Sequence, residues 1–409
     1  MRILYLSQYF FPEMGATQIR AYEMASNWVR LGHQVTMICE VPNHPAGIIF
    51  PDYKGKLYKI EQIDGIDVIH VWVKASPKKS FTNRMLFYLS FMINATLAGL
   101  FLAHKSFDLI YASSPPLFVG GAALGLSLIR NLPLVFEVRD LWPESAIALG
   151  ELNNPQAISL AYRLEKACYE RARKIVAVTL GIQHRLAERG IPSNKIQVIP
   201  NGSNTELFIF NPEERLRIRR EMGWEGKFVA LYAGILGIAQ GLDILIEVAK
   251  RLTDHPDIQI VMIGDGPSRG DLVTAISKNK LSNVMLLPEK PRDQIPAYLS
   301  AADVALIPLR DIEIFKGALP SKLFDAWSCQ RPVILSVDGE ARQLLEHAEA
   351  GLFVPPENPG KMTSAILKLK SLESLREAMG IRGRQLTISN FSRQKQAEKL
   401  EDILSSILH

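Results

Sequence analysis

Lys322 and Asp325 have the types and the spacing to bind a phosphorylated sugar. Pro320 followed by Ser321 is typical of a helix start, where the missing N–H of proline would be unpaired anyway. The free N–H groups and the positive dipole end of such a start favour a phosphate or diphosphate. On the same face of this helix, Lys322 would add a cation and Asp325 would accept hydrogen bonds from sugar hydroxyls. The alternative is a purely structural helix–turn–strand unit, which any parallel α/β protein contains.

The elements around this pair predict a parallel sheet. The helix is expected at residues 320–329, and the apolar run at 333–335 follows it as a buried strand. Strand-like and helical segments alternate in the same way through both halves of the chain. We therefore predict an α/β fold with two doubly wound Rossmann-like domains facing across a cleft.

A break in this alternation marks the domain boundary. The turn Pro200-Asn201-Gly202 is followed by a polar stretch, which is typical of a hinge between domains. The expected N-terminal domain covers residues 1–203 and the C-terminal domain covers 204–390. A last helix over 391–409 has one apolar face and can pack on either domain, including back on the N-terminal one.

Composition indicates a globular protein, with 47% hydrophobic and 22% charged residues among 409. Three widely spaced cysteines argue against a disulfide framework or a zinc site, and the first residues read as a strand rather than as a signal peptide. We expect a cytoplasmic protein. Residues 1–205 hold 21 Lys and Arg against 15 Asp and Glu. This excess favours contact with anionic lipid or a phosphorylated substrate, or it reflects scattered surface lysines.

An uncharged segment of 18 residues, 86–103, follows Lys74, Lys78, Lys79 and Arg84. Its length lies at the lower limit for a membrane span, and its polar residues weaken that interpretation. The preferred interpretation is a helix packed on the sheet. Partial insertion into the membrane interface is the first alternative, and spanning is the second.

Two glycine-containing loops follow strands and have different candidate roles. Gly15 lies after the first strand, where open parallel sheets bind ligands, and lets the backbone approach one. The G-x-G-x-x-G dinucleotide fingerprint is absent there. The stretch Gly264-Asp265-Gly266 is either a plain strand-to-helix turn or a contact near a nucleoside.

The order of motifs along the chain resembles the retaining glycosyltransferases of family 4, which have the GT-B fold. The fragments that carry the resemblance run nearly end to end: FPEMGAT, LGHQVTMI, VIPNG, LYAGILGIAQGLD, MIGDGP, AADVALIPL and PSKLFDAWSCQRPVI. FPEMGATQIR, VPNHPAG and RDLWPES further resemble bacterial N-acetyl-L-fucosamine transferases of O-antigen and capsule assembly. The resemblance implies sugar transfer from a nucleoside diphosphate donor, usually UDP-linked, to a glycan on a polyprenyl diphosphate carrier.

By this resemblance the donor lies on the C-terminal domain and the acceptor enters over the N-terminal domain. Catalytic roles fall on Lys322, Arg139 and Asp140, although Asp140 could also simply cap its segment. Contacts with the donor fall on Gly15, Ala16, Gly234, Gln240, Lys290, Gly317, Ala318, Leu319, Pro320, Ser321 and Asp325.

Several positions depart from the family pattern. Ile235 and Gln240 stand where many members have the arginine and lysine that hold the diphosphate, while Gly317 and Asp325 replace the paired glutamates. A histidine–aspartate pair corresponds here to Arg139 and Asp140. We interpret these changes as a subgroup variant in which a lysine and an arginine, Lys322 and Arg139, supply the positive charge.

The implied mechanism stabilises negative charge on the departing diphosphate and needs no nucleophilic carboxylate. The sequence has no Asp-x-Asp or histidine cluster that suggests a bound cation, so we expect no metal cofactor. The expected partners are a nucleotide sugar, a lipid-linked glycan and, peripherally, the inner face of the cytoplasmic membrane, but no nucleic acid. A nucleotide-sugar 2-epimerase of the same fold and an inactive sugar-nucleotide-binding scaffold are the alternatives.

Overall fold

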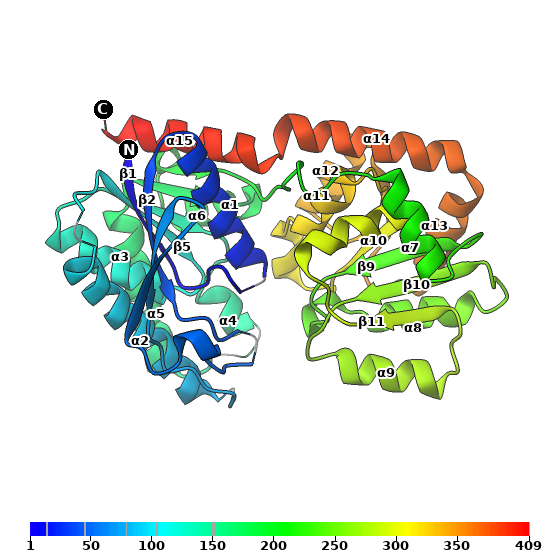
Figure 1. Cartoon of the computed structure of the whole chain (residues 1–409), viewed down its shortest axis with the longest axis horizontal. Coiled ribbons are helices and arrows are strands. Elements are labelled where there is room, and N and C mark those ends of the chain that lie inside the picture. The colour runs from blue at the N-terminus through cyan, green and yellow to red at the C-terminus, as the bar shows by residue number, and fades with distance from the viewer. Residues whose placement is uncertain are drawn as a thin grey trace. The chain divides into compact units, whose positions relative to one another are not determined.

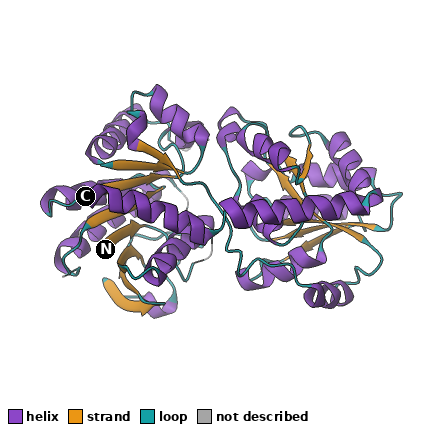
Figure 2. Ribbon diagram, turned by 90° about the horizontal axis from the view of Figure 1, so that it is seen from above, coloured by secondary structure: helices purple, strands orange, loops and turns teal. Residues whose placement is uncertain are grey.

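The computed structural model describes residues 1–13, 15–44, 46–78, 80–103, 105–148, 150 and 152–408. Lys79, one of the basic residues before the apolar segment, lies outside this set. The chain forms two units, 1–200 together with 394–409, and 201–393. Helices flank a sheet in each unit (Figures 1 and 2).

The first unit has an eight-stranded sheet in the order β3-β4-β2-β1-β5-β6-β7-β8. Its neighbouring strands are parallel except for the hairpin of β3 and β4. The strands are β1 Arg2–Ser7, β2 Gln34–Glu40, β3 Tyr58–Ile63, β4 Ile66–Val71, β5 Leu109–Ser114, β6 Leu134–Val138, β7 Lys174–Ala177 and β8 Ile196–Val198. The helices are α1 Ala16–Arg30, η1 Pro51–Tyr53, α2 Phe81–Phe101, α3 Phe118–Ile129, α4 Glu144–Ala148, α5 Pro155–Arg171, α6 Leu180–Glu188, η2 Ser193–Lys195 and α15 Arg393–Leu408.

The second unit has a six-stranded parallel sheet in the order β11-β10-β9-β12-β13-β14. The strands are β9 Phe228–Ala233, β10 Ile258–Ile263, β11 Val284–Leu287, β12 Val304–Pro308, β13 Val333–Ser336 and β14 Gly351–Phe353. The helices are α7 Pro212–Glu221, η3 Ile238–Gln240, α8 Asp243–Arg251, α9 Arg269–Lys278, η4 Arg292–Gln294, α10 Ile295–Ala301, η5 Glu313–Gly317, α11 Ser321–Ser328, α12 Glu340–Ala348, α13 Pro359–Ser371 and α14 Glu373–Asn390.

The predicted fold class is confirmed, because each unit is a doubly wound α/β domain with a largely parallel sheet. In both sheets the strand order reverses beside the first strand, at β1 next to β5 and at β9 next to β12. Loops at the carboxyl ends of these strands are where such sheets bind ligands. The topology therefore brings the loops that carry the predicted residues to one edge of each sheet.

The chain crosses from one unit to the other after Pro200 and after Arg393. The first crossing lies within the predicted turn. The two crossing segments pair with each other, because the Ser203 N–H donates to Phe391 O at 3.0 Å and the Arg393 N–H donates to Ser203 O at 2.9 Å. The last helix, α15, belongs to the first unit, where Trp28 Nε1 donates to Ala397 O at 3.3 Å.

Candidate functional site

In the second unit, Lys322 lies against the carboxyl end of β9. Helix α11 follows β12, which neighbours β9 in the sheet, so its first turn meets the loop that begins at Gly234. A Cβ added at Gly234 would lie 2.2 Å from Cε and 3.0 Å from Nζ of Lys322. Only a glycine at position 234 leaves room for this lysine, and the positive φ of 142° there also favours glycine.

The Lys322 ammonium is held in a poorly solvated place beside an aromatic ring. Its Nζ lies 5.3 Å from the ring centroid of Tyr232, a cation–π distance. Burial lowers the pKa of Lys322 to about 8, and the charge of Asp325 opposes that shift only in part. A cation whose charge is destabilised in this way gains from binding an anion.

The helix start beside Lys322 also fits an anion. Pro320 is the N-cap of α11, and no side chain caps the helix. Ser321 is the first helical residue, and the N–H of Leu323 donates back to Pro320 O at 3.1 Å. The predicted combination of one lysine and a helix N-terminus is therefore present at one place in the second unit.

The loop after β9 packs closely on the loop after β10. A Cβ at Gly264 would lie 2.0 Å from Gly234 O, and one at Gly266 would lie 2.6 Å from Leu236 O. The Leu236 N–H donates to Asp265 O at 2.8 Å. These glycines thus serve the close approach of two backbone segments, which favours the turn interpretation of residues 264–266 over a nucleoside contact.

The other predicted donor residues of the second unit lie on loops around the same edge of the sheet. Gln240 ends η3, and Lys290 Nζ lies 5.8 Å from the ring centroid of Tyr298. Gly317 ends η5, Ala318 follows it, and Leu319 is buried. Among the residues that the structure describes, no hydrogen bond or ion pair joins Gln240, Lys290 or Gly317 to Lys322.

The residues that replace a basic pair leave an apolar patch on the β9 loop. Ile235, at the family's arginine position, is 54% exposed, and Ile238 beside it is 73% exposed. Neither can contribute charge to a diphosphate. Two cations lie against this loop: Lys322 beside Gly234, and Arg310 beside Gly241, where Arg310 is paired with Asp243.

Asp325 has a structural partner that the sequence did not indicate. Its Oδ1 accepts a hydrogen bond from the fully buried Ser203 hydroxyl at 2.6 Å. Ser203 belongs to the segment paired with residues 391–393. Asp325 therefore ties α11 to the crossing segment, and this contact was missed because 122 residues separate the two side chains.

In the first unit, the predicted residues of the N-terminal domain gather around the start of α1. Arg139 follows β6 directly, and its Nη2 donates to Ala16 O at 3.2 Å. Gly15 is the N-cap of α1, and its carbonyl accepts from the Ile19 N–H at 2.9 Å. Its φ of 177° is ordinary extended backbone, so nothing in the backbone angle requires glycine there. Gly15, Ala16 and Arg139 are thus brought together.

Asp140 has a hydrogen-bonded and perturbed carboxyl group. Its Oδ2 accepts from the hydroxyl of Ser145, in the short helix α4, at 2.7 Å. Burial raises the pKa of Asp140, while the hydrogen bonds from Ser145 and from the Leu141 N–H oppose the rise. These contacts tie the end of β6 to α4, so Asp140 has a structural role here.

A buried ion pair below Arg139 was not predicted. Arg20 of α1 and Glu137 of β6 are 2.7 Å apart, and both side chains are fully buried. Although burial opposes it, the charges of Arg20 and then Arg139 lower the pKa of Glu137. Arg20 also donates to the carbonyls of Ile199 and Pro200. The pair fixes α1 against β6 and the end of the first crossing, and only the three-dimensional fold could reveal it.

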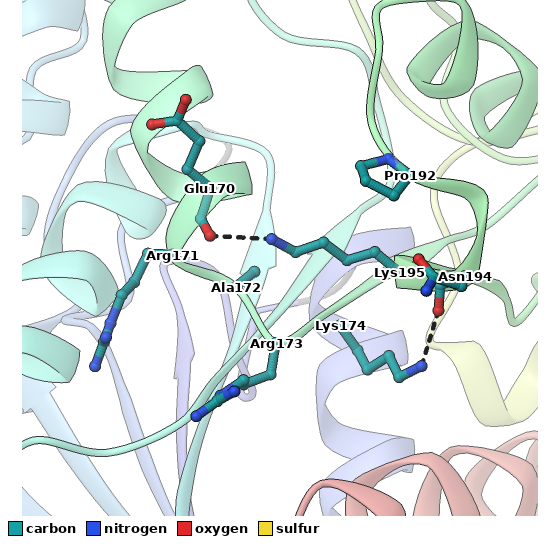
Figure 3. Close-up of a pocket in the computed structure, with 8 residues that line it drawn as sticks. All are labelled: Glu170, Arg171, Ala172, Arg173, Lys174, Pro192, Asn194 and Lys195. Atoms are coloured by element: carbon teal, nitrogen blue, oxygen red, sulfur yellow. Dashed lines mark hydrogen bonds between the residues drawn. The ribbon is translucent and has the colours of Figure 1, made fainter.

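A basic hollow of about 470 Å³ lies elsewhere in the first unit (Figure 3). It is lined by Glu170, Arg171, Ala172, Arg173, Lys174, Pro192, Asn194 and Lys195. Lys174 starts β7, whereas Arg139 follows the end of the parallel neighbour β6, so the hollow is at the opposite edge of the sheet. It is distinct from the predicted site. Across the residues that the structure describes, no group of three or more His, Cys, Asp or Glu could hold a metal ion.

Both halves of the chain match known protein families. Residues 15–202 match the glycosyl transferase 4-like domain, and residues 214–386 match the glycosyl transferases group 1. The putative colanic acid biosynthesis glycosyl transferase WcaI of Escherichia coli (strain K12) is 24% identical over 348 residues, 83% of this chain and 82% of that protein. The alpha-D-kanosaminyltransferase of Streptomyces kanamyceticus is 27% identical over 289 residues, 69% of this chain and 72% of that protein.

Solved structures share the fold over its whole length. Anabaena HepE in complex with UDP and glucose has a TM-score of 0.74 at 20% identity, covering 99% of this chain and 100% of that one. Sucrose-phosphate synthase from Thermosynechococcus elongatus has a TM-score of 0.76 at 18% identity, covering 99% and 98%. The fold and the two domain matches define a glycosyltransferase. With a 4-like domain followed by a group 1 domain, it is a GT-B glycosyltransferase of the family 4 type.

Proposed function

We propose that the protein transfers a sugar, with retention of its anomeric configuration, from a UDP-linked donor to a glycan carried on polyprenyl diphosphate. The observation that carries this proposal is the arrangement of Lys322, Gly234 and the uncapped start of α11 at one edge of the second sheet. A desolvated ammonium beside free backbone N–H groups suits the diphosphate of a nucleotide sugar.

The chemical need is to stabilise a leaving group. The bond between the anomeric carbon and the diphosphate oxygen breaks as the acceptor hydroxyl oxygen bonds to the same face of that carbon. The proton of the acceptor passes to an oxygen of the departing diphosphate. Negative charge grows on the diphosphate during this step, and Lys322 is placed to stabilise it. Asp325 is proposed to accept hydrogen bonds from the ribose in addition to the one that its Oδ1 accepts from Ser203.

In the first unit, Arg139 is proposed to supply further positive charge for the departing diphosphate, and Asp140 is proposed to orient the acceptor or the donor sugar. Both residues directly follow β6, at the edge of the sheet where parallel α/β folds bind ligands. The raised pKa of Asp140, caused by burial, favours a carboxyl group that exchanges a hydrogen bond with a sugar hydroxyl.

The biological context proposed is surface polysaccharide assembly, in the fucosamine transferase subgroup that the N-terminal motifs resemble. Relatives named for colanic acid and amylovoran biosynthesis support this context. A polyprenyl-linked acceptor would place the protein peripherally at the inner face of the cytoplasmic membrane. The UDP complexes of HepE support UDP as the nucleotide.

Incubation with a panel of UDP-sugars, with and without a polyprenyl diphosphate glycan, tests the proposal. Acceptor-dependent release of UDP and a product with the donor's anomeric configuration are expected, with EDTA causing no loss. An altered sugar still attached to UDP would instead identify a 2-epimerase. Binding without turnover would identify a scaffold, and inversion in the product would reject the retaining mechanism.

A further inference from the structure

Helix α2 of the first unit packs through its small residues. Ala95, Ala98 and Gly99 are buried in its interface, together with Phe91. A Cβ at Gly99 would lie 2.5 Å from Leu126 of α3, so the two helices approach closely, and Figure 1 shows them in the same unit. Several other large apolar residues of α2 lie on its other face.

The outer face of α2 is a stripe of exposed apolar side chains. Its members recur at helical spacing of three or four residues and are 37–64% exposed: Leu86, Leu89, Ile93, Leu97 and Phe101. No charged residue occurs from Met85 to Ala103. A water-soluble surface helix usually shows the reverse pattern, so a partner of apolar character fits this face.

A membrane-spanning role does not suit this helix. Among the described residues it is the one helix long and apolar enough to cross a membrane, with 22% of its most apolar window buried. Hydrogen bonds hold α2 on the first unit: Asn94 Nδ2 donates to Trp72 O at 2.8 Å, and the Lys74 N–H donates to Ser90 Oγ at 2.8 Å. A helix packed on one side and apolar on the other suits the plane of a membrane interface.

The residues around the stripe carry positive charge, which indicates the kind of partner surface that fits it. Residues 68–107 contain five Lys and Arg and no Asp or Glu. Lys74 and Lys78, before the helix, are exposed, while Lys105, after it, pairs with Asp67 at 2.5 Å. An anionic surface complements this segment. A second copy meeting it face to face would instead bring like charges together.

We propose that the outer face of α2 docks on an anionic lipid surface, with the helix axis parallel to that surface. The stripe Leu86–Phe101 enters the boundary between headgroups and acyl chains, and Lys74 and Lys78 contact lipid phosphates. The proposal deepens the proposed function, because it rests on the membrane location of a lipid-linked acceptor and names the surface that reaches it.

Sedimentation with lipid vesicles tests docking without any sugar substrate. The protein is mixed with vesicles of phosphatidylcholine alone or of phosphatidylcholine with phosphatidylglycerol, at low and high salt. Wild type is expected to bind the anionic vesicles and to be partly released by salt. Ile93→Glu with Leu97→Glu is expected to weaken binding at least tenfold, because charge cannot enter the acyl boundary. Lys74→Gln with Lys78→Gln is expected to weaken it about 30-fold at low salt.

The matched control is Leu216→Glu, at a 64% exposed position of α7 in the second unit, which is expected to bind like wild type. UDP release with a soluble acceptor is expected to be the same in the stripe variant as in wild type, so loss of transfer alone would count against the proposed function and not against docking. The docking proposal is overturned if the wild-type protein binds neither kind of vesicle. It is also overturned if the wild-type protein binds neutral vesicles as well as anionic ones. Stripe variants that still bind, or a dimer that the stripe variant dissolves, would overturn it too.

Discussion

At the scale of single residues, Lys322 is a cation of the second unit whose surroundings destabilise its charge. Its side chain packs on the backbone of Gly234, and its ammonium lies near the ring of Tyr232. Burial lowers its pKa to about 8. The buried charge of this lysine lowers the stability of the folded protein. A bound diphosphate would stabilise that charge, which favours binding. The two expectations that follow concern its charge and its protonation.

Lys322→Ala is expected to lower turnover roughly a hundredfold, because one preorganised cation at the leaving group is lost. The fold is expected to persist, because the substitution removes a charge that burial destabilises in the folded state. Initial rates of UDP release measure the effect, and Lys278→Ala, an exposed lysine at the end of α9, is the control. Equal rates in both variants would move the role to Arg139.

The lowered pKa of Lys322 predicts a pH dependence with a definite sign. Because the folded-state pKa of about 8 lies below the ordinary lysine value of 10.5, the unfolded chain binds more protons between these values. The contribution of this group to stability therefore rises with pH there. UDP binding has the opposite dependence, because it needs the ammonium. Its affinity is expected to fall as pH rises through about 8. Calorimetry in buffers of different ionisation enthalpy should detect proton uptake near that pH, and Lys322→Gln should abolish it.

At the scale of elements, two side-chain contacts near its start hold α11 in place. Lys322 meets the loop after β9, while Asp325 accepts from Ser203 in the segment that crosses between units. The sequence alone assigned Asp325 to a ribose, and the structure adds an anchoring role. The two roles predict different effects for substitutions at the two ends of this hydrogen bond.

Asp325→Asn is expected to raise the dissociation constant of UDP several-fold, because a neutral amide accepts hydrogen bonds less strongly than a carboxylate. Ser203→Ala removes only the anchor and is expected to destabilise the protein by about 1–3 kcal/mol, with a smaller effect on UDP affinity. Calorimetric titration with UDP and thermal unfolding measure the two quantities. If Ser203→Ala weakens UDP binding as much as Asp325→Asn, Asp325 acts only by positioning α11.

Local patterns in the sequence predicted local structure well. The turn Pro200-Asn201-Gly202 indicated the crossing between the units, and Pro320-Ser321 indicated the start of α11. The Arg20–Glu137 and Ser203–Asp325 contacts could not be found in this way, since 117 and 122 residues separate their partners. The apolar segment 86–103 was expected to pack on the sheet. It does so through Phe91 and its small side chains, and it leaves a stripe of other large side chains exposed, which composition alone could not decide.

At the scale of the whole molecule, the first unit is built from both ends of the chain. Residues 394–409 return to it, and Ala397, Leu400 and Leu404 of α15 are buried in a core cluster with Tyr5 and Trp28. His33 and Glu401 add a polar contact at 2.8 Å. The stability of the first unit therefore depends on the last residues of the sequence, whereas the second unit is continuous.

This arrangement predicts that one buried leucine near the C-terminus affects the unit that begins the chain. Leu400→Ala leaves a cavity among the side chains around Trp28 and is expected to destabilise the first unit by about 2–5 kcal/mol. The matched control is Leu369→Ala, equally buried in α13, which is expected to destabilise the second unit by a similar amount. Differential scanning calorimetry, with proteolysis at rising temperature to identify the unit that opens, distinguishes them. If Leu400→Ala opened residues 201–393 first, or changed no transition, α15 would not be part of the first unit's cooperative core.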